Sequence, residues 1–138
     1  MLFCAGTDNG LYVKVEPFVL PWQRIGHANN VTAMAQSGGR LFCSTADNVL
    51  WVRNTQLSDV NWSRIGHANN VVAMTAQNGN LVCATADRTI WVRPAVDADV
   101  PWTPIGQAPE PVRGIGFLSS TKEFWVSTNT DRLYTFTG

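Results

Sequence analysis

Charge is scarce in this sequence, and neither sign is in excess. Charged side chains make up 14% of the 138 residues, and ten lysines and arginines balance ten aspartates and glutamates. Because these residues are scattered without runs, the sequence lacks the basic surface expected of a protein that binds nucleic acid or an anionic membrane. No apolar run approaches the roughly 18 residues of a membrane span, and the N-terminus lacks the pattern of a signal peptide. We therefore expect a cytoplasmic protein or one released by a non-classical route.

Cysteine and histidine are also scarce, with three and two residues. Cys4, Cys43 and Cys83 are spaced by 39 and 40 residues, and no closely spaced pair offers the ligands of a zinc site. We expect free, buried thiols, no metal and no cofactor. Neither His27 nor His67 is accompanied by the nucleophile and carboxylate of a catalytic triad, and a later copy of the same segment lacks the histidine. The sequence therefore predicts no catalytic residues and a protein that is not an enzyme.

Helical periodicity is missing as well. No stretch offers apolar residues at i, i+3, i+4 and i+7 over three turns behind a capping residue. Short segments such as VTAMA, LFCST and VLWVR instead alternate or run apolar over four to six residues, and Ser-Gly-Gly, Asn-Gly-Asn and Asp-Asn separate them. These segments and separators are typical of strands joined by tight turns, so we predict an all-β protein.

The strongest positive feature is an internal repeat. The block WQRIGHANNVTAMAQSGGRLFCSTADNVLWVR, from Trp22 to Arg53, returns 40 residues later from Trp62 to Arg93. A more divergent copy begins at Trp102, and Leu2–Val15 matches the second half of a further copy. We treat residues 1–138 as one domain with approximate repeats 1–21, 22–61, 62–101 and 102–138.

Four strand types recur, for example an inner strand at 31–36, two strands at 41–46 and 49–54, and an outer strand at 62–65. Four strands in about 40 residues are typical of one blade of a β-propeller. Summed over the chain, the copies predict 14 strands, or about three and a half blades, with no inner strand at the start and no outer strand at the end. A partial ring exposes sheet edges, so we expect it to close by self-association, as a homodimer.

Six tryptophans form two repeated sets. Trp51 and Trp91 lie in the third predicted strand of their copies, whereas Trp62 and Trp102 open the fourth, as does Trp22. One set is expected to pack between blades, and a flat ring beside fixed polar groups is also the usual platform for a sugar. Two residues beyond Trp51 and Trp91, on the same side of the strand, Arg53 and Arg93 are expected to complete such a pocket.

The segment Gly-His-Ala-Asn-Asn precedes the predicted inner strand in two copies. Its polar side chains either stabilise the loop, as asparagine commonly does in turns, or contact a hydroxyl-rich ligand. The Asp-Asn and Asp-Arg pairs between the second and third strands favour turns over a calcium site, since only one carboxylate recurs in each. The candidate ligand-binding residues of this segment are His27, Asn29, Asn30, His67, Asn69 and Asn70.

These motifs resemble a known repeat. Trp-x-x-Ile-Gly-His-Ala-Asn-Asn-Val-x-Ala-Met, followed by Leu-Phe-x-x-Thr-x-Asp-Asn-x-Leu-Trp-x-Arg, is similar to the tectonin-type propeller repeat, and most of all to that of bacterial fucose-binding propeller lectins. The likeness is strong in the two central copies, partial at Leu2–Val15 and weak at Trp102–Gly138. It implies a propeller lectin with shallow sugar sites repeated around the ring, often between blades.

We therefore predict a carbohydrate-binding protein that binds glycans, fucosylated glycans in particular, and gains strength from repeated weak sites. The alternative is a propeller scaffold for protein partners, since tectonin-type repeats also occur in proteins that bind other proteins. Near-identity of the polar segments His27–Asn30 and His67–Asn70 favours a shared ligand, because a fold alone needs only the glycines and core positions repeated.

Overall fold

The computed structural model describes residues 1–137 of the chain, and all regular elements in this range are strands. The 14 strands are β1 (Leu2–Ala5), β2 (Gly10–Lys14), β3 (Gln23–His27), β4 (Val31–Ser37), β5 (Arg40–Thr45), β6 (Val49–Asn54), β7 (Ser63–His67), β8 (Val71–Gln77), β9 (Asn80–Thr85), β10 (Thr89–Pro94), β11 (Thr103–Gln107), β12 (Val112–Leu118), β13 (Glu123–Thr128) and β14 (Leu133–Thr137). The all-β prediction is confirmed.

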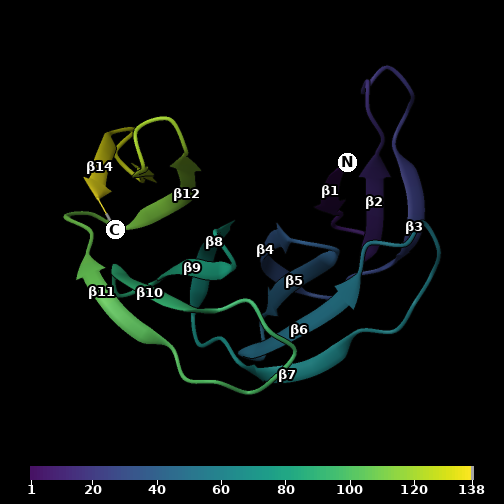
Figure 1. The fold of residues 1–138 in the computed structure, drawn as a ribbon, viewed down its shortest axis with the longest axis horizontal. Helices are drawn as coiled ribbons and strands as arrows, with labels where there is room; N and C mark the ends of the chain where they lie inside the picture. The colour runs from purple at the N-terminus through teal and green to yellow at the C-terminus, as the bar shows by residue number, and fades with distance from the viewer. Residues whose placement is uncertain (138) are drawn as a thin grey trace.

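The strands form four antiparallel sheets, each a simple meander along the chain. Sheet 1 contains β1 to β3, sheet 2 contains β4 to β7, sheet 3 contains β8 to β11 and sheet 4 contains β12 to β14. Figure 1 shows the four sheets side by side in an arc, with β4, β8 and β12 nearest the centre and β3, β7 and β11 on the outside. This arrangement is that of propeller blades. The predicted inner and outer strands are confirmed.

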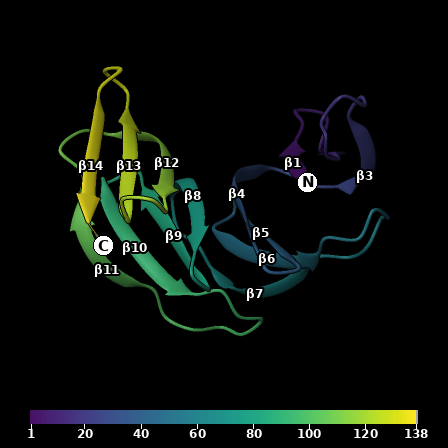
Figure 2. The ribbon, with the colours of Figure 1, turned by 45° about the horizontal axis from the view of Figure 1, so that its top comes forward.

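The two end sheets are incomplete. Sheet 1 has no counterpart of the inner strands β4 and β8, and sheet 4 has no counterpart of the outer strands β7 and β11 within residues 1–137. In both Figure 1 and Figure 2 these two sheets lie at opposite ends of the arc with no further strand between them. The Trp-initiated sequence repeat is therefore out of phase with the sheets, because the strand that follows each Trp belongs to the preceding sheet.

Local sequence explains the turns and the irregularities of the strands. Asn9, Asn48 and Arg88, each in the turn between the second and third strands of a copy, have φ between 62° and 72°, a left-handed conformation that asparagine tolerates well. Register shifts occur between Leu50 and Trp51 and between Ile90 and Trp91. Such bulges redirect side chains, and here they lie at the two tryptophans of the third strands.

The core lies between consecutive sheets and has three parts. Leu11, Val13 and Ile25 of sheet 1 pack with Leu41 of sheet 2. Sheets 2 and 3 enclose a second cluster, and sheets 3 and 4 enclose a third that is built around Phe124. Each sheet is thus stabilised mainly by its neighbours. The interfaces between sheets are referred to below as the first, second and third junctions.

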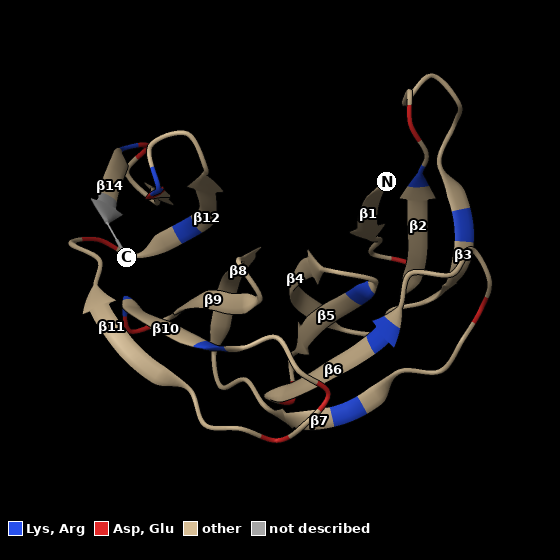
Figure 3. Ribbon diagram, viewed as in Figure 1, with Lys and Arg blue, Asp and Glu red and all other residues tan. Residues whose placement is uncertain are grey.

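Figure 3 shows the lysines and arginines placed at intervals along the ribbon, with aspartates and glutamates between them. Residues 1–137 contain no helix that is long and apolar enough to cross a membrane.

Candidate functional site

Two pockets open at equivalent places, one at the first junction and one at the second. The first-junction pocket has a volume of about 490 Å³ and the second-junction pocket about 330 Å³. Nine lining positions are the same residue type in both, one repeat apart. These pairs are His27 and His67, Ala28 and Ala68, Asn29 and Asn69, Asn30 and Asn70, Cys43 and Cys83, Thr45 and Thr85, Asp47 and Asp87, Trp51 and Trp91, and Trp62 and Trp102.

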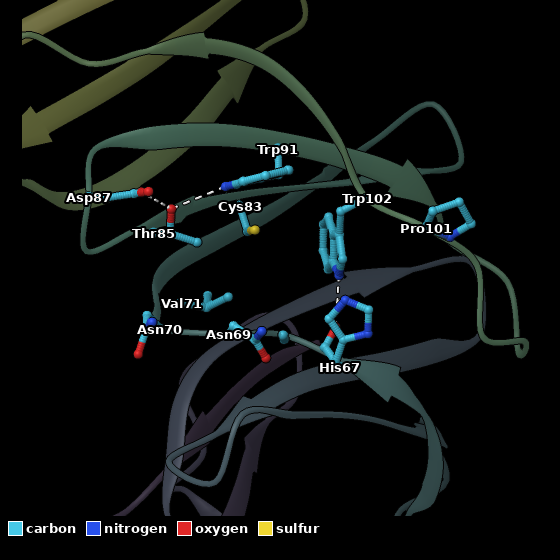
Figure 4. A pocket seen from close by; sticks show the side chains of 11 residues that line it. His67, Asn69, Asn70, Val71, Cys83, Thr85, Asp87, Trp91, Pro101 and Trp102 are labelled. Atoms are coloured by element: carbon cyan, nitrogen blue, oxygen red, sulfur yellow. Dashed lines mark hydrogen bonds between the residues drawn. The ribbon is translucent and has the colours of Figure 1, made fainter.

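Each pocket takes its walls from two sheets. In the second-junction pocket, His67 ends β7 of sheet 2, whereas Trp91 lies on β10 of sheet 3 and Trp102 precedes β11. Figure 4 shows the two indole rings on one side of the hollow and the loop from His67 to Asn70 on the other. The Trp102 indole nitrogen donates a hydrogen bond to the His67 carbonyl oxygen at 2.8 Å, and Trp62 does the same to His27 at 2.7 Å.

A chain of hydrogen bonds fixes the other tryptophan. The Trp91 indole nitrogen donates to Thr85 Oγ1 at 3.1 Å, and that hydroxyl donates in turn to Asp87 Oδ1 (Figure 4). The indole nitrogen of Trp91 is thus bonded inside the protein, and the apolar part of the ring is left to line the pocket. Trp51 is fixed in the same way by Thr45 and Asp47.

Asp87 is an ionised acceptor at the rim of the pocket. The hydrogen bond from Thr85, followed by that from the Thr89 backbone, holds the pKa of Asp87 below its ordinary value. An ionised carboxylate accepts up to about four hydrogen bonds, so this group can accept further donors from a bound molecule. The side chain is exposed.

The two asparagines of each loop differ in role. Asn30 and Asn70 both have φ of 56°, and their carbonyl oxygens accept the backbone amides of Ala46 and Ala86 at 2.9 Å. Their backbone conformation and carbonyl contacts hold the turn, whereas their exposed side-chain amides have no hydrogen-bond partner among the described residues. No hydrogen bond ties the side-chain amide of Asn69 to another of the described residues, and its side chain is exposed at the pocket edge. The same holds for Asn29.

The two histidines that line the pockets make different side-chain contacts. His27 Nδ1 lies 3.1 Å from Asp59 Oδ1, whereas the His67 side chain is exposed and has no such partner among the described residues. Both contribute a backbone carbonyl to the tryptophan contact described above. Among residues 1–137, no group of three His, Cys, Asp or Glu side chains could hold a metal ion.

Arg53 and Arg93 do not share a pocket with Trp51 and Trp91, contrary to expectation. Both arginines are buried, with 3% and 1% of their surface exposed. The Arg93 guanidinium donates to the carbonyl oxygens of Pro94, Val96 and Ala98 at 3.0, 2.9 and 2.7 Å, and lies 5.8 Å from the centre of the Trp102 ring. It therefore organises the loop before β11 and supports Trp102. Arg53 does the same for the loop before β7, with its guanidinium 6.0 Å from the Trp62 ring.

The sequence analysis missed two residue types that the structure brings into the pockets. Thr45 and Thr85 were only part of a strand pattern, and Asp47 and Asp87 were interpreted as turn residues. The turn interpretation describes their backbone correctly, but their side chains line the pockets as well. The repeated Thr-x-Asp spacing was the signal that could have identified them.

Cys43 and Cys83 line the same pockets and are almost fully buried, at 2% and 1% exposed. Burial disfavours the charged thiolate and raises the pKa of each thiol to about 12. Cys4 is partly buried, and all three thiols are free.

Comparison with known proteins supports the fold alone. No family model matches the sequence, and no curated protein matches it. Among solved structures, a gluconolactonase from Xanthomonas campestris is similar with a TM-score of 0.68 and 11% identity over 91% of this chain. The match covers 43% of the gluconolactonase, so this chain spans less than half of its length. The computationally designed Ika4 protein matches with a TM-score of 0.47 and 13% identity over 84% of this chain and 99% of its own.

The gluconolactonase comparison corrects one prediction. We inferred from the repeat and from the missing triad that the chain is not an enzyme. A structure with this arrangement of sheets is an enzyme, so that prediction is withdrawn. The physical reason is that a fold positions side chains without deciding their chemistry.

The loop contacts of Arg93 predict a loss of stability on truncation. Replacing Arg93 with Ala removes three hydrogen bonds from a buried charged group and leaves three carbonyl oxygens without that donor. We expect the free energy of unfolding to fall by roughly 3 kcal/mol, measured by urea denaturation. Arg113→Ala is the matched control, because Arg113 makes an exposed ion pair with Asp131 that is worth about 1 kcal/mol or less. Equal losses in the two variants would contradict the role assigned to Arg93.

The raised thiol pKa values predict selective labelling. The reactive form is the thiolate, so at pH 8 a disulfide reagent should modify Cys43 and Cys83 only as fast as the protein unfolds. Cys4 should react first. In a Cys4→Ser variant, rapid labelling in the folded state would show that the pocket floors are open to reagent.

Proposed function

We propose that this chain is a carbohydrate-binding propeller whose sugar sites are the pockets of the first and second junctions. The proposed ligands are glycans, and fucosylated glycans in particular, as the resemblance to tectonin-type propeller lectins implies. The observation that carries the proposal is the matched lining of the two pockets, in which nine positions are identical one repeat apart.

The chemistry of the lining suits a sugar. Trp91 and Trp102 offer apolar rings against which the C–H face of a sugar can stack. Asp87 accepts hydrogen bonds from hydroxyl groups, and the free amide of Asn69 both donates and accepts. A hydroxyl-rich ring needs this combination, because each hydroxyl is at once a donor and an acceptor.

The pocket volumes agree with a small ligand. Ligand pockets in proteins typically measure about 300–1,000 Å³, and the two pockets lie in the lower half of that range. A monosaccharide or the end of a glycan matches such a volume. Because the two sites are open and small, each is expected to bind weakly, and affinity for a glycan surface would come from simultaneous binding at several sites.

We further propose that two copies of this 138-residue chain close a ring. The end sheets leave unpaired edges at β1 and β14, and such edges favour association. Trp22 is 42% exposed and its indole nitrogen has no partner among the described residues, whereas its counterparts Trp62 and Trp102 each bind the preceding sheet. Two copies would supply eight sheets, within the four to eight blades of known propellers.

Removing the stacking rings tests the proposed sites. Replacing Trp51 and Trp91 together with Ala should abolish binding on a glycan array, while the far-ultraviolet circular dichroism stays nearly unchanged. Stacking of an aromatic ring is worth on the order of 0.5–1.5 kcal/mol beyond area burial, so a weak site should fall below detection without it. Isothermal titration of the two single variants with L-fucose then measures how much binding free energy each site loses.

Leu57→Ala is the control, because this exposed apolar side chain lies outside both pockets and should leave glycan binding intact. Retained glycan binding in a folded double variant would remove Trp51 and Trp91 from the site. An array on which the wild-type chain binds nothing would favour the protein-scaffold alternative. Hydrolysis of gluconolactone, measured in the same samples, would assign the chain the activity of its structural neighbour.

The proposed ring predicts the mass of the particle in solution. Light scattering at micromolar concentration should give about twice the chain mass of 15.1 kDa, with loss of fold on dilution. Burial of the end-sheet edges provides the physical reason. A well-folded monomer that is stable on dilution would overturn the two-copy ring without affecting the pockets.

A further inference from the structure

The third junction is built like the first two but contains a side chain that they lack. Thr128 pairs with Val112 across β13 and β12, as Thr85 pairs with Val71 across β9 and β8. Tyr134 pairs with Val126, as Trp91 pairs with Cys83. Thr128 and Tyr134 therefore stand where Thr85 and Trp91 line the second-junction pocket.

Glu110 precedes this junction at the position of Asn69. The backbone contact that follows is preserved, since the Asn129 amide donates to the Pro111 carbonyl oxygen at 3.0 Å, as the Ala86 amide does to Asn70. Asn69 leaves its amide free at the pocket edge. Glu110 instead is partly buried and turned towards sheet 4.

The Glu110 carboxylate accepts hydrogen bonds from three hydroxyl groups of sheet 4. Its Oε1 accepts from Tyr134 at 2.8 Å and from Thr128 at 3.3 Å, and its Oε2 accepts from Thr130 at 2.6 Å. Thr128 is only 1% exposed. These bonds, with those from Thr130 and Tyr134 the strongest, lower the pKa of Glu110, so the carboxylate is ionised at neutral pH.

A change in the hairpin turn accounts for this arrangement. In the second junction the carboxylate that accepts from Thr85 comes from Asp87, two residues on. In the third junction Thr130 stands at the place of Asp87. Thr128, the counterpart of Thr85, therefore has no acidic acceptor in its own turn. Glu110 supplies the acceptor from the opposite wall and so crosses the space between the sheets.

We propose that Glu110 is an internal occupant of the third junction, where its carboxylate takes the place of a ligand and closes the site. The consequence for ligand binding rests on the function proposed above, and the geometric part does not. On this proposal the first and second junctions can bind a ligand, whereas the third junction cannot, because Glu110 occupies it.

Chemical rescue by acetate tests the geometric part directly. A Glu110→Ala variant removes the acceptor that the three hydroxyl groups share, although Thr128 keeps its contacts with Thr130 and the Arg132 carbonyl, and acetate should bind there as a detached carboxylate. We expect sodium acetate at pH 7 to raise the unfolding temperature of this variant in a saturable manner, relative to sodium chloride at equal ionic strength. Wild type and Glu16→Ala should not respond, because Glu16 is an exposed glutamate whose one hydrogen-bond partner among the described residues is the N-terminal amine. A folded Glu110→Ala variant that acetate does not stabilise would overturn the proposal.

A measurement on the wild-type chain covers the case in which this variant fails to fold. The carboxyl carbon of Glu110, followed by NMR against pH, should titrate below the ordinary range of a glutamate carboxyl group. Titration of Glu110 within that ordinary range would overturn the proposal. Titration of the wild-type chain with L-fucose separates the two claims. Acetate rescue without fucose binding would contradict the proposed sugar function alone. Fucose binding without acetate rescue would contradict the role of Glu110 alone.

Discussion

The contact between a tryptophan of one sheet and a carbonyl of the sheet before it is the constraint on which the rest of the structure depends. Trp62 donates to the His27 carbonyl and Trp102 to that of His67, so each outer strand is held against its neighbour. The Trp62 ring lines a pocket and also lies 6.0 Å from the guanidinium of the buried Arg53. Because the tryptophan is held by the preceding sheet, sheet packing sets the shape of the pocket, and a complete pocket forms only where two successive sheets and this tryptophan meet.

A second requirement recurs in all four copies, but different residues meet it. The polar group of the third strand must find an acidic acceptor. In sheet 1 the Tyr12 hydroxyl donates directly to Asp8, and in sheet 3 Thr85 mediates between a tryptophan and Asp87. In sheet 4 the acceptor comes from Glu110. When the acceptor is a turn residue such as Asp87, the pocket between the sheets stays open. On the proposal above, when the acceptor is Glu110 of the facing loop, its side chain occupies that space.

Strands and turns could be predicted from the sequence because both depend on neighbours in the chain. Period-two alternation and turn residues gave the strand order, with bounds within one or two residues, as for the expected 41–46 against the observed Arg40–Thr45. The site was harder. Alternation indicates the face of a strand to which Arg53 belongs but not which group it meets there, and three loop carbonyls beneath Trp62 bind it. A carboxylate such as that of Asp87 can serve a turn and a pocket at once, and sequence shows only the turn.

The two copies that form the open pockets differ at some positions and agree at others. Buried positions differ between the copies, since Phe42 corresponds to Val82 and Leu50 to Ile90, although all four side chains are at most 2% exposed. A core tolerates such exchanges if volume and pattern are roughly kept. The exposed Asn29 and Asn69 are identical, although neither side-chain amide is bonded to another described residue and their loss would leave the core intact. Identity at these exposed positions beside variation at buried ones supports the proposal that the two pockets share a ligand.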